Sequence, residues 1–286
     1  MNPQRPTSIA AEGESLRVAI LSSTQFGLRC LSEGIAGISG VQVVGILTTP
    51  SQIDISYSKK PVELKTHADF SEIARIVSCE IAVVNGPVRT RDYLTSLDRW
   101  RPHLLLALGW YYNVPKAVRN STQLGCAGIH ASLLPRFRGG APINWAIIQG
   151  ESETGVTFFY LTDEIDAGDV IAQQAFAIDP NDTCATLYEK AEQASVDILH
   201  TWLPKLANGT APRVPQDHSQ ATQFPQRNPD DGLINWSWNG DRIQNFIRAQ
   251  TRPYPGAYFI AGRHKVIVWD ATIVELSESE HLREAG

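Results

Sequence analysis

Unbroken runs of apolar residues recur along much of the chain. A strand that is apolar at nearly every position is buried on both faces, which is typical of a parallel sheet covered by helices. The runs predict strands over residues 16–23, 41–50, 80–86, 103–110, 128–134, 154–163 and 169–178.

Helical segments separate these strands. Asp69 or Ser71 is placed to cap one helix, and another has Pro142 in its first turn and Gly150 just past its end. The alternation of strands and helices predicts an α/β fold with a doubly wound, mostly parallel sheet. The predicted helices cover residues 26–37, 69–77, 142–150 and 182–209.

The chain changes character after the long helix. Residues 209–229 are rich in Pro, Gln and Asp and are predicted to be a linker. Short predicted strands at 233–239, 257–262 and 264–276, with a helix at 240–250, indicate a small β-rich C-terminal domain. The predicted organisation is a disordered N-terminus (1–15), a large α/β domain (16–208), the linker (209–229), the small domain (230–274) and a polar tail (275–286).

Composition narrows the class of protein. The chain is 43% hydrophobic and carries a net charge of −5, which is a poor general surface for nucleic acid. The four cysteines are far apart and include no C-x-x-C pair, which favours reduced thiols over disulfides or zinc. Neither a signal-peptide apolar region nor a run of about 18 apolar residues is present. We expect a cytoplasmic protein without membrane or nucleic-acid partners.

Polar side chains gather where predicted strands end. His130 closes one strand, a Ser-Leu-Leu-Pro-Arg-Phe-Arg-Gly-Gly loop follows it, and Asp166 comes 36 residues later. An adjacent strand could bring that carboxylate next to the imidazole, where it would fix the tautomer. A satisfied core histidine and a capping turn are the structural alternatives. The pattern alone predicts an α/β enzyme with a His/Asp site.

A long segment resembles a known family. The stretch IHASLLPRFRGGAPINWAIIQGESETGVTFFYLTDEIDAGDVIAQ resembles the core of the folate-dependent formyltransferases. These include methionyl-tRNA, glycinamide ribonucleotide and sugar N-formyltransferases. Downstream, INWSWNGDRIQNFIRAQTRPYPGAYF resembles the C-terminal region of the methionyl-tRNA and sugar branches. The resemblance implies that 16–208 is a formyltransferase catalytic domain, with 10-formyltetrahydrofolate as cosubstrate and no metal.

The resemblance also implies a site. His130 and Asp166 match the family's catalytic histidine and aspartate, whereas the family's asparagine falls on Gly128. The expected folate-binding residues are Leu133, Leu134, Pro135, Arg136, Arg138, Gly139, Gly140, Asp163, Glu164 and Ile165. The expected acceptor-binding residues are Trp110, Tyr111, Tyr112, Ser56 and Tyr57, although each aromatic ring could equally be core packing.

Gly128 is a departure at a catalytic position. An asparagine amide there would donate to the oxyanion that develops on the formyl group, and losing such a donor costs roughly 10²–10³ in rate. We therefore expect Gly128→Asn to raise the rate by at least about tenfold. There are two alternative explanations of Gly128. It could only make room for a bulky ligand, or it could be a substitution that inactivates the enzyme.

The acceptor is expected to be small. Residues 205–286 carry nine Lys or Arg and nine Asp or Glu, which is no basic face for tRNA. GWYYNVPK and ISYSKKPVE resemble stretches of the sugar branch, which favours a nucleotide-linked amino deoxysugar. Three alternatives stay open: a non-sugar amine such as hydroxyornithine in siderophore assembly, a weakly active enzyme, and a relative that binds without turnover. A homodimer is also left open.

Overall fold

The computed structural model describes residues 14–53, 61–85 and 89–275. The chain divides into two compact units. The first contains Met1–Arg138, Gly155–Ala175 and Lys190–Gln223, and the second contains Gly139–Thr154, Phe176–Glu189 and Phe224–Gly286.

A seven-stranded sheet with the order β10-β9-β7-β6-β1-β2-β5 organises the first unit. The pairs β1–β2, β1–β6, β2–β5 and β6–β7 are parallel, whereas β7–β9 is antiparallel. The predicted mostly parallel, doubly wound sheet is therefore confirmed. Its strands are β1 (Leu16–Leu21), β2 (Val41–Thr48), β5 (Glu80–Val83), β6 (Leu104–Ala107), β7 (Gly125–His130), β9 (Glu153–Tyr160) and β10 (Val170–Ala177).

One face of this sheet is covered by α3 (Thr90–Trp100) and α4 (Lys116–Arg119). Tyr93, Leu97 and Trp100 of α3 pack with buried residues of β1, β2, β6 and β7 in one apolar cluster. The Trp100 ring lies directly against Gly45 of β2, so a residue with a β-carbon would not fit at that position. Burial on this scale supplies the main favourable term for the fold.

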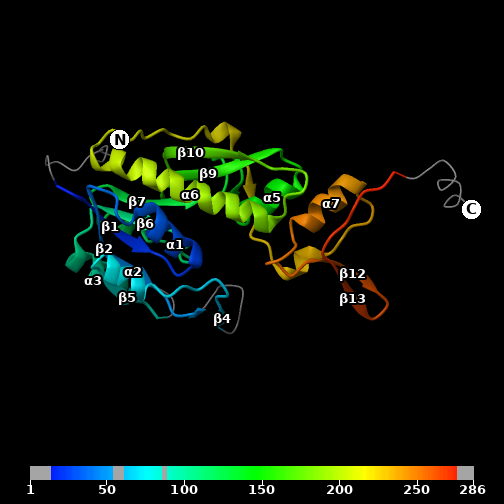
Figure 1. The fold of residues 1–286 in the computed structure, drawn as a ribbon, viewed down its shortest axis with the longest axis horizontal. Coiled ribbons are helices and arrows are strands. Elements are labelled where there is room, and N and C mark those ends of the chain that lie inside the picture. Colours follow the sequence, from blue (N-terminus) through cyan, green and yellow to red (C-terminus); the bar gives the residue numbers. More distant parts are fainter. Residues whose placement is uncertain (1–13, 54–60, 86–88, 276–286) are drawn as a thin grey trace, which may run out of the picture. The chain divides into compact units, whose positions relative to one another are not determined.

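The first helical segment and the long helix α6 (Cys184–Ala207) lie side by side, as Figure 1 shows. The predicted helix at 26–37 is present as α1 (Gln25–Arg29) followed by a π-helical segment, Cys30–Ile35. Gly34 faces Val196 of α6, and the Arg29 guanidinium pairs with Glu192 at 3.2 Å. Close helix contact thus depends on a residue without a side chain.

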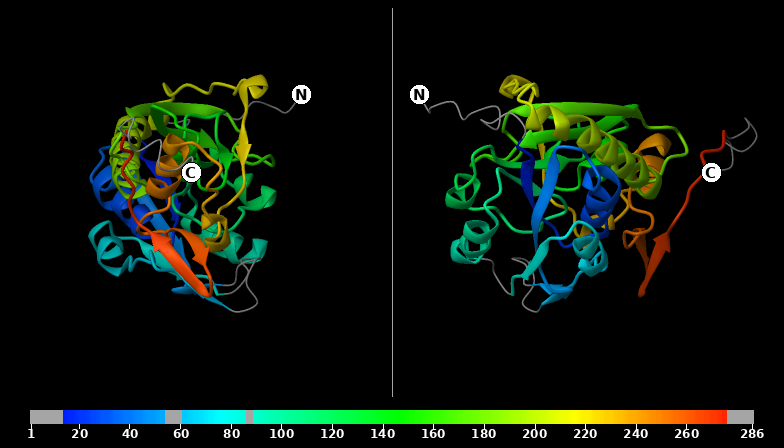
Figure 2. Two further views of the ribbon diagram at one scale, coloured as in Figure 1. Left: turned by 90° about the vertical axis from the view of Figure 1, so that its right-hand side faces the viewer. Right: turned by 60° about the vertical axis from the view of Figure 1, so that its left-hand side comes forward.

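The second unit contains α5 (Pro142–Ile148), α7 (Gly240–Arg248) and the antiparallel hairpin of β12 (Ala257–Ala261) and β13 (His264–Val268), drawn in orange in Figure 2. The predicted strands at 257–262 and 264–276 are confirmed, although the second is shorter. The predicted strand at 233–239 is wrong. Asn235 instead accepts hydrogen bonds from the Ser237 amide and hydroxyl, and only Leu233 forms an isolated bridge, to Tyr258.

Smaller elements complete the described chain. They are β3 (Gln52–Ile53), β4 (Val62–Glu63), α2 (Ser71–Ile76), β8 (Arg138–Gly139), β11 (Gln223–Phe224) and the 3₁₀ turns His218–Gln220 and Pro229–Gly232. The N-cap of α2 is Phe70, which makes no side-chain capping bond, so the prediction of Asp69 or Ser71 as the cap is wrong. Asp69, one residue before that cap, instead accepts a hydrogen bond from the Ser71 amide in a local turn. None of the helices in the described part of the chain is long and apolar enough to cross a membrane.

Candidate active site

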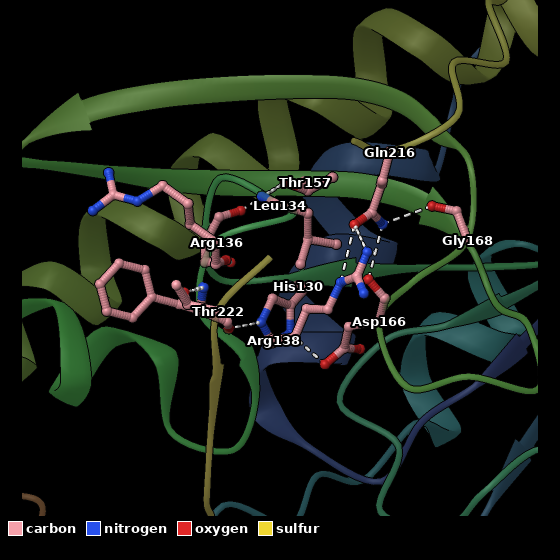
Figure 3. Close-up of polar contacts among 11 residues, drawn as sticks. His130, Leu134, Arg136, Arg138, Thr157, Asp166, Gly168, Gln216 and Thr222 are labelled. Carbon is pink, nitrogen blue, oxygen red and sulfur yellow. Dashed lines mark hydrogen bonds and ion pairs between the residues drawn. The ribbon is translucent and has the colours of Figure 1, made fainter. Parts of the chain in front are cut away.

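His130 ends β7 at the carboxyl edge of the parallel strands, which is where open α/β sheets bind ligands. Its side chain is only 10% exposed. The imidazole lies between two oxygen acceptors, as Figure 3 shows: Nε2 is 2.7 Å from the Phe137 carbonyl oxygen and Nδ1 is 3.6 Å from Asp166 Oδ2. The structure thus brings together the two residues that the sequence placed 36 positions apart.

The contact with Phe137 determines which ring nitrogen carries a hydrogen. A carbonyl oxygen only accepts, so Nε2 of His130 donates to it. In the neutral imidazole Nδ1 is then the unprotonated nitrogen, and it faces the Asp166 carboxylate. The geometry is compatible with general-base chemistry at Nδ1, the ring nitrogen that faces the carboxylate.

Asp166 reaches His130 from a turn that doubles back. Because β9 runs antiparallel to β7, its end at Tyr160 lies opposite Ala127 rather than beside His130. Residues 161–169 must therefore return along the sheet before Asp166 meets the imidazole. Asp166 adopts φ +52°, a left-handed conformation that surrounding contacts must hold in place.

The loop after His130 is fixed by buried hydrogen bonds. Thr157 of β9 donates to the Ser132 carbonyl at 2.6 Å and accepts from the Leu134 amide at 3.0 Å. The Gln173 amide donates to the Leu134 carbonyl at 2.8 Å. Leu133 lies against Gly155, where no other residue would leave it room. A loop restrained at both its amide and carbonyl groups is a rigid wall for a ligand.

The two arginines of this loop have different environments. Arg136 is exposed, with its guanidinium 5.3 Å from the Phe137 ring centroid. Arg138 has a buried side chain, which contacts Gln216, Glu164 and His218. In Figure 3 the Arg138 side chain points toward the Asp166 turn, whereas the Arg136 side chain points away from it. Only Arg138 is therefore part of the polar network around Asp166.

Gly128 lies two residues before His130 on the same strand face. A β-carbon on residue 128 would lie 2.9 Å from the Ala107 carbonyl oxygen and 3.0 Å from Leu161 Cδ1. Both distances are shorter than ordinary van der Waals contact. The direction in which a side chain would leave this strand is thus already filled by the neighbouring strand and by the start of the 161–169 turn.

The aromatic residues after β6 have separate surroundings. Trp110 packs edge-on against Tyr93 and donates to its hydroxyl at 3.0 Å, and it lies 5.8 Å from the Tyr112 ring. Tyr111 is 51% exposed, with its hydroxyl 3.4 Å from Thr66 Oγ1. Of Trp110, Tyr111 and Tyr112, Tyr111 is therefore the one that presents its ring to solvent. Tyr93, the partner of Trp110, is buried, and burial raises its pKa to about 12.

The remaining predicted residues are divided between the units. Ser56 and Tyr57 lie outside the described residues. Gly139 and Gly140 belong to the second unit, where the chain from Phe224 to Gln226 passes against their backbone. Pro135, the last of the predicted loop residues, is half-buried in the first unit.

The acidic turn residues differ in their partners. Asp163 pairs with Lys116 at 2.9 Å and with Arg119. Hydrogen bonds from Lys116 and then Arg119 lower the pKa of its carboxyl. Glu164 contacts Arg138 at 3.4 Å, while the Ile165 side chain is 59% exposed. Asp163 therefore stays ionised, and Ile165 offers an apolar surface next to Asp166.

Two family models together match most of the chain. One, described as formyl transferase, matches residues 17–203, and a second, described as formyl transferase C-terminal domain, matches residues 227–286. This chain belongs to the formyl transferase family. The first model covers β7, the loop after it and the Asp166 turn, so the His130–Asp166 pair lies within the matched residues.

Solved structures share the fold of this family member. HypX from Aquifex aeolicus is 18% identical with a TM-score of 0.63, over 90% of this chain and 39% of HypX. A 4-N formyltransferase from Francisella tularensis is 19% identical with a TM-score of 0.69, over 91% of this chain and 100% of the other. The N-formyltransferase from Helicobacter canadensis, in complex with folinic acid and dTDP-3-aminofucose, is 18% identical with a TM-score of 0.63, over 87% and 86%. The chain thus spans well under half the length of HypX.

Sequence reasoning missed several residues of this site. Thr157, Gln173 and Gln216 bind the loop and the turn through side-chain hydrogen bonds. Each is one polar residue in a segment whose pattern indicates only a strand or a linker. Among the described residues, no group of three His, Cys, Asp or Glu side chains is placed to hold a metal ion.

Proposed function

We propose that this formyl transferase family member transfers a formyl group from 10-formyltetrahydrofolate to the amine of a small acceptor. The observation that carries the proposal is the His130–Asp166 pair, with Nε2 held by the Phe137 carbonyl and Nδ1 3.6 Å from the carboxylate. This geometry leaves one ring nitrogen for proton transfer.

The reaction needs a proton to leave the acceptor nitrogen. His130 accepts it at Nδ1, directly or through water, as the nitrogen bonds to the formyl carbon. Asp166 stabilises the resulting imidazolium. The proton then passes to the departing folate nitrogen, so the pair returns to its starting state. Phe137 keeps the ring in one orientation throughout.

The residues around the pair fit a folate cosubstrate, which supplies the formyl carbon when bound. Leu133 on the loop is half-buried, and Ile165 on the turn is 59% exposed. These apolar side chains belong to the loop and the turn that carry the buried polar pair, and small-molecule sites combine apolar walls with a few polar groups. Exposed Arg136 offers a cation for a carboxylate. HypX has also been solved with tetrahydrofolic acid, which supports the same ligand class here.

For the acceptor we propose a nucleotide-linked amino deoxysugar. The Helicobacter canadensis relative was solved with dTDP-3-aminofucose, and the fold is shared over 87% of this chain. Exposed Tyr111 is a candidate for stacking on a base or sugar face. A cytoplasmic location follows from the same proposal, because folate cosubstrates and nucleotide sugars would both be met there.

The proposal predicts folate binding and formylation. Calorimetry with 5-formyltetrahydrofolate is expected to detect a complex, and 10-formyltetrahydrofolate with a panel of amino sugars, hydroxyornithine and other amines is expected to yield a formylated sugar. Formylation of hydroxyornithine alone would overturn the sugar acceptor but keep formyl transfer. Absence of binding at millimolar 5-formyltetrahydrofolate would overturn the folate proposal itself.

Gly128 favours a second candidate, a relative that binds folate or a nucleotide sugar without turnover. Position 128 offers no amide donor for an oxyanion, and the nearest atoms are the Ala107 carbonyl oxygen and a leucine methyl. Neither of these donates a hydrogen bond. Binding of both ligands without any product would favour this candidate over the enzyme.

We also predict that the protein does not formylate methionyl-tRNA. Residues 205–286 carry equal numbers of basic and acidic residues, nine each, so this region has no net positive charge to attract a polyanion. A gel shift with methionyl-tRNA is expected to show no complex at micromolar protein. Micromolar affinity that falls steeply with salt would contradict the prediction.

A further inference from the structure

A ring of contacts joins the two members of the candidate catalytic pair through the protein. His130 donates to the Phe137 carbonyl, and the next residue, Arg138, donates to the Gln216 side chain. Gln216 in turn donates to the Asp166 carbonyl. The contact between Asp166 and His130 closes the ring, which Figure 3 shows as a continuous path of dashed lines and backbone.

Gln216 is the member of this ring whose side chain is fully engaged. Its Nε2 donates to the carbonyl oxygens of Asp166 at 2.8 Å and Gly168 at 2.7 Å. Its Oε1 accepts from Arg138 Nε at 3.2 Å and Nη2 at 2.7 Å. Two donated and two accepted bonds are all that an amide can make. Reversing the amide would set its oxygen against two carbonyls, so the orientation is determined.

The turn that Gln216 holds needs an external restraint. Asp166 has φ +52°, which a residue with a side chain keeps only where its surroundings enforce it. Gln216 binds the carbonyls on both sides of Ala167, and it is itself only 7% exposed. A buried amide with two partners on one turn is a strong restraint, because losing these bonds would leave the buried Gln216 amide without its acceptors.

Residues 213–222, here called the strap, keep Gln216 in place. Val214 exchanges both backbone hydrogen bonds with Val170, and Arg213 pairs with Asp169 at 2.7 Å. At the other end of the strap, Thr222 accepts from the Phe137 amide through its hydroxyl and from the Arg138 amide through its carbonyl. The strap thus binds both the turn that carries Asp166 and the loop that holds His130.

We propose that Gln216 is a positioning residue for formyl transfer: it sets the Asp166 carboxylate at its distance from His130 by fixing the backbone of the turn. This inference rests on the proposed function. Gln216 acts through Asp166, and its partner Arg138 supplies a buried positive charge that holds the amide oxygen. A segment expected to be a linker therefore takes part in the active site.

The test uses Gln216→Glu in the full chain. The new side chain still accepts from Arg138, so that buried guanidinium keeps its partner, but a carboxylate oxygen replaces the donor that faces two carbonyls. We expect kcat to fall at least tenfold while KM for 10-formyltetrahydrofolate and for the acceptor changes less than twofold. Amide hydrogen exchange in the 163–169 turn is expected to become faster.

Gln220→Glu is the matched control. Gln220 lies on the same strap and is exposed, and its side chain donates one long hydrogen bond, to Ser219, so this variant should keep the wild-type kcat. Should Gln216→Glu fail to fold, Gln216→Met is expected to give the same fall in kcat.

The outcomes separate the two proposals. A wild-type protein that formylates no acceptor overturns the proposed function. An active wild type with an unchanged kcat in Gln216→Glu overturns the positioning role alone, even where the turn exchanges faster. An equal fall of kcat in Gln220→Glu also overturns it. So does a fall of kcat/KM in Gln216→Glu that comes from a higher KM rather than from a lower kcat.

Discussion

Replacing His130 by alanine is expected to lower the rate of formyl transfer roughly 10²–10⁴-fold, the range for loss of a general acid–base group. The physical reason is that Nδ1 is the one ring nitrogen not committed to the backbone, so no other atom of this residue could take the proton. Single-turnover rates with 10-formyltetrahydrofolate and the amino-sugar acceptor would measure the effect. Circular dichroism should show an unchanged fold.

Asp166→Ala is expected to cause a loss of similar kind, and the double variant should be little slower than the worse single variant. Groups that act as one unit are strongly non-additive, because the second removal finds the function already gone. His200→Ala, at an exposed position on α6, is the matched control and should keep the wild-type rate. Near-full activity in His130→Ala would show that the imidazole is structural.

Restoring an amide at position 128 is expected to raise the rate by at least about tenfold, provided that the side chain is given room. The sequence alone predicted this gain for Gly128→Asn. The structure adds that a β-carbon there meets Leu161 Cδ1 at 3.0 Å and the Ala107 carbonyl oxygen at 2.9 Å. We therefore combine Gly128→Asn with Leu161→Val, which removes that methyl at a cost of about 1 kcal/mol.

Two single variants complete this experiment. Leu161→Val alone should keep the wild-type rate, since it adds no hydrogen-bond donor. Gly128→Asn alone should gain less than the double variant, because the Leu161 side chain must move first, whereas the contact with the Ala107 carbonyl oxygen is the same in both. An unchanged rate in the double variant, with folate binding and melting temperature intact, would show that the site does not use an amide donor at this position.

The sequence by itself determined which segments form most strands of the sheet. Runs such as 16–21 and 104–107 are apolar at almost every position, which is typical of a strand buried on both faces, and they form β1 and β6. The pairing of His130 with Asp166 was also accessible, because both fall where predicted strands end and a family motif spans them. The strand predicted at 233–239 is absent because the Asn235 side chain binds the backbone two residues later, at Ser237. Such a local hydrogen bond competes with strand pairing, and the apolar residues nearby suggest a strand all the same.

The tertiary structure alone decided how the pair is held. The antiparallel direction of β9 makes the turn fold back to His130, and strand direction leaves no mark on an apolar run. Gln216 lies 50 residues beyond Asp166, in a Pro- and Gln-rich segment that carries no periodic signal. The contact of Leu161 with the space beside Gly128 likewise has no signal in the sequence. Such contacts form between segments that are distant in the sequence. The role of a single residue such as Gln216 or Leu161 can therefore be recognised only when the fold shows which residues it contacts.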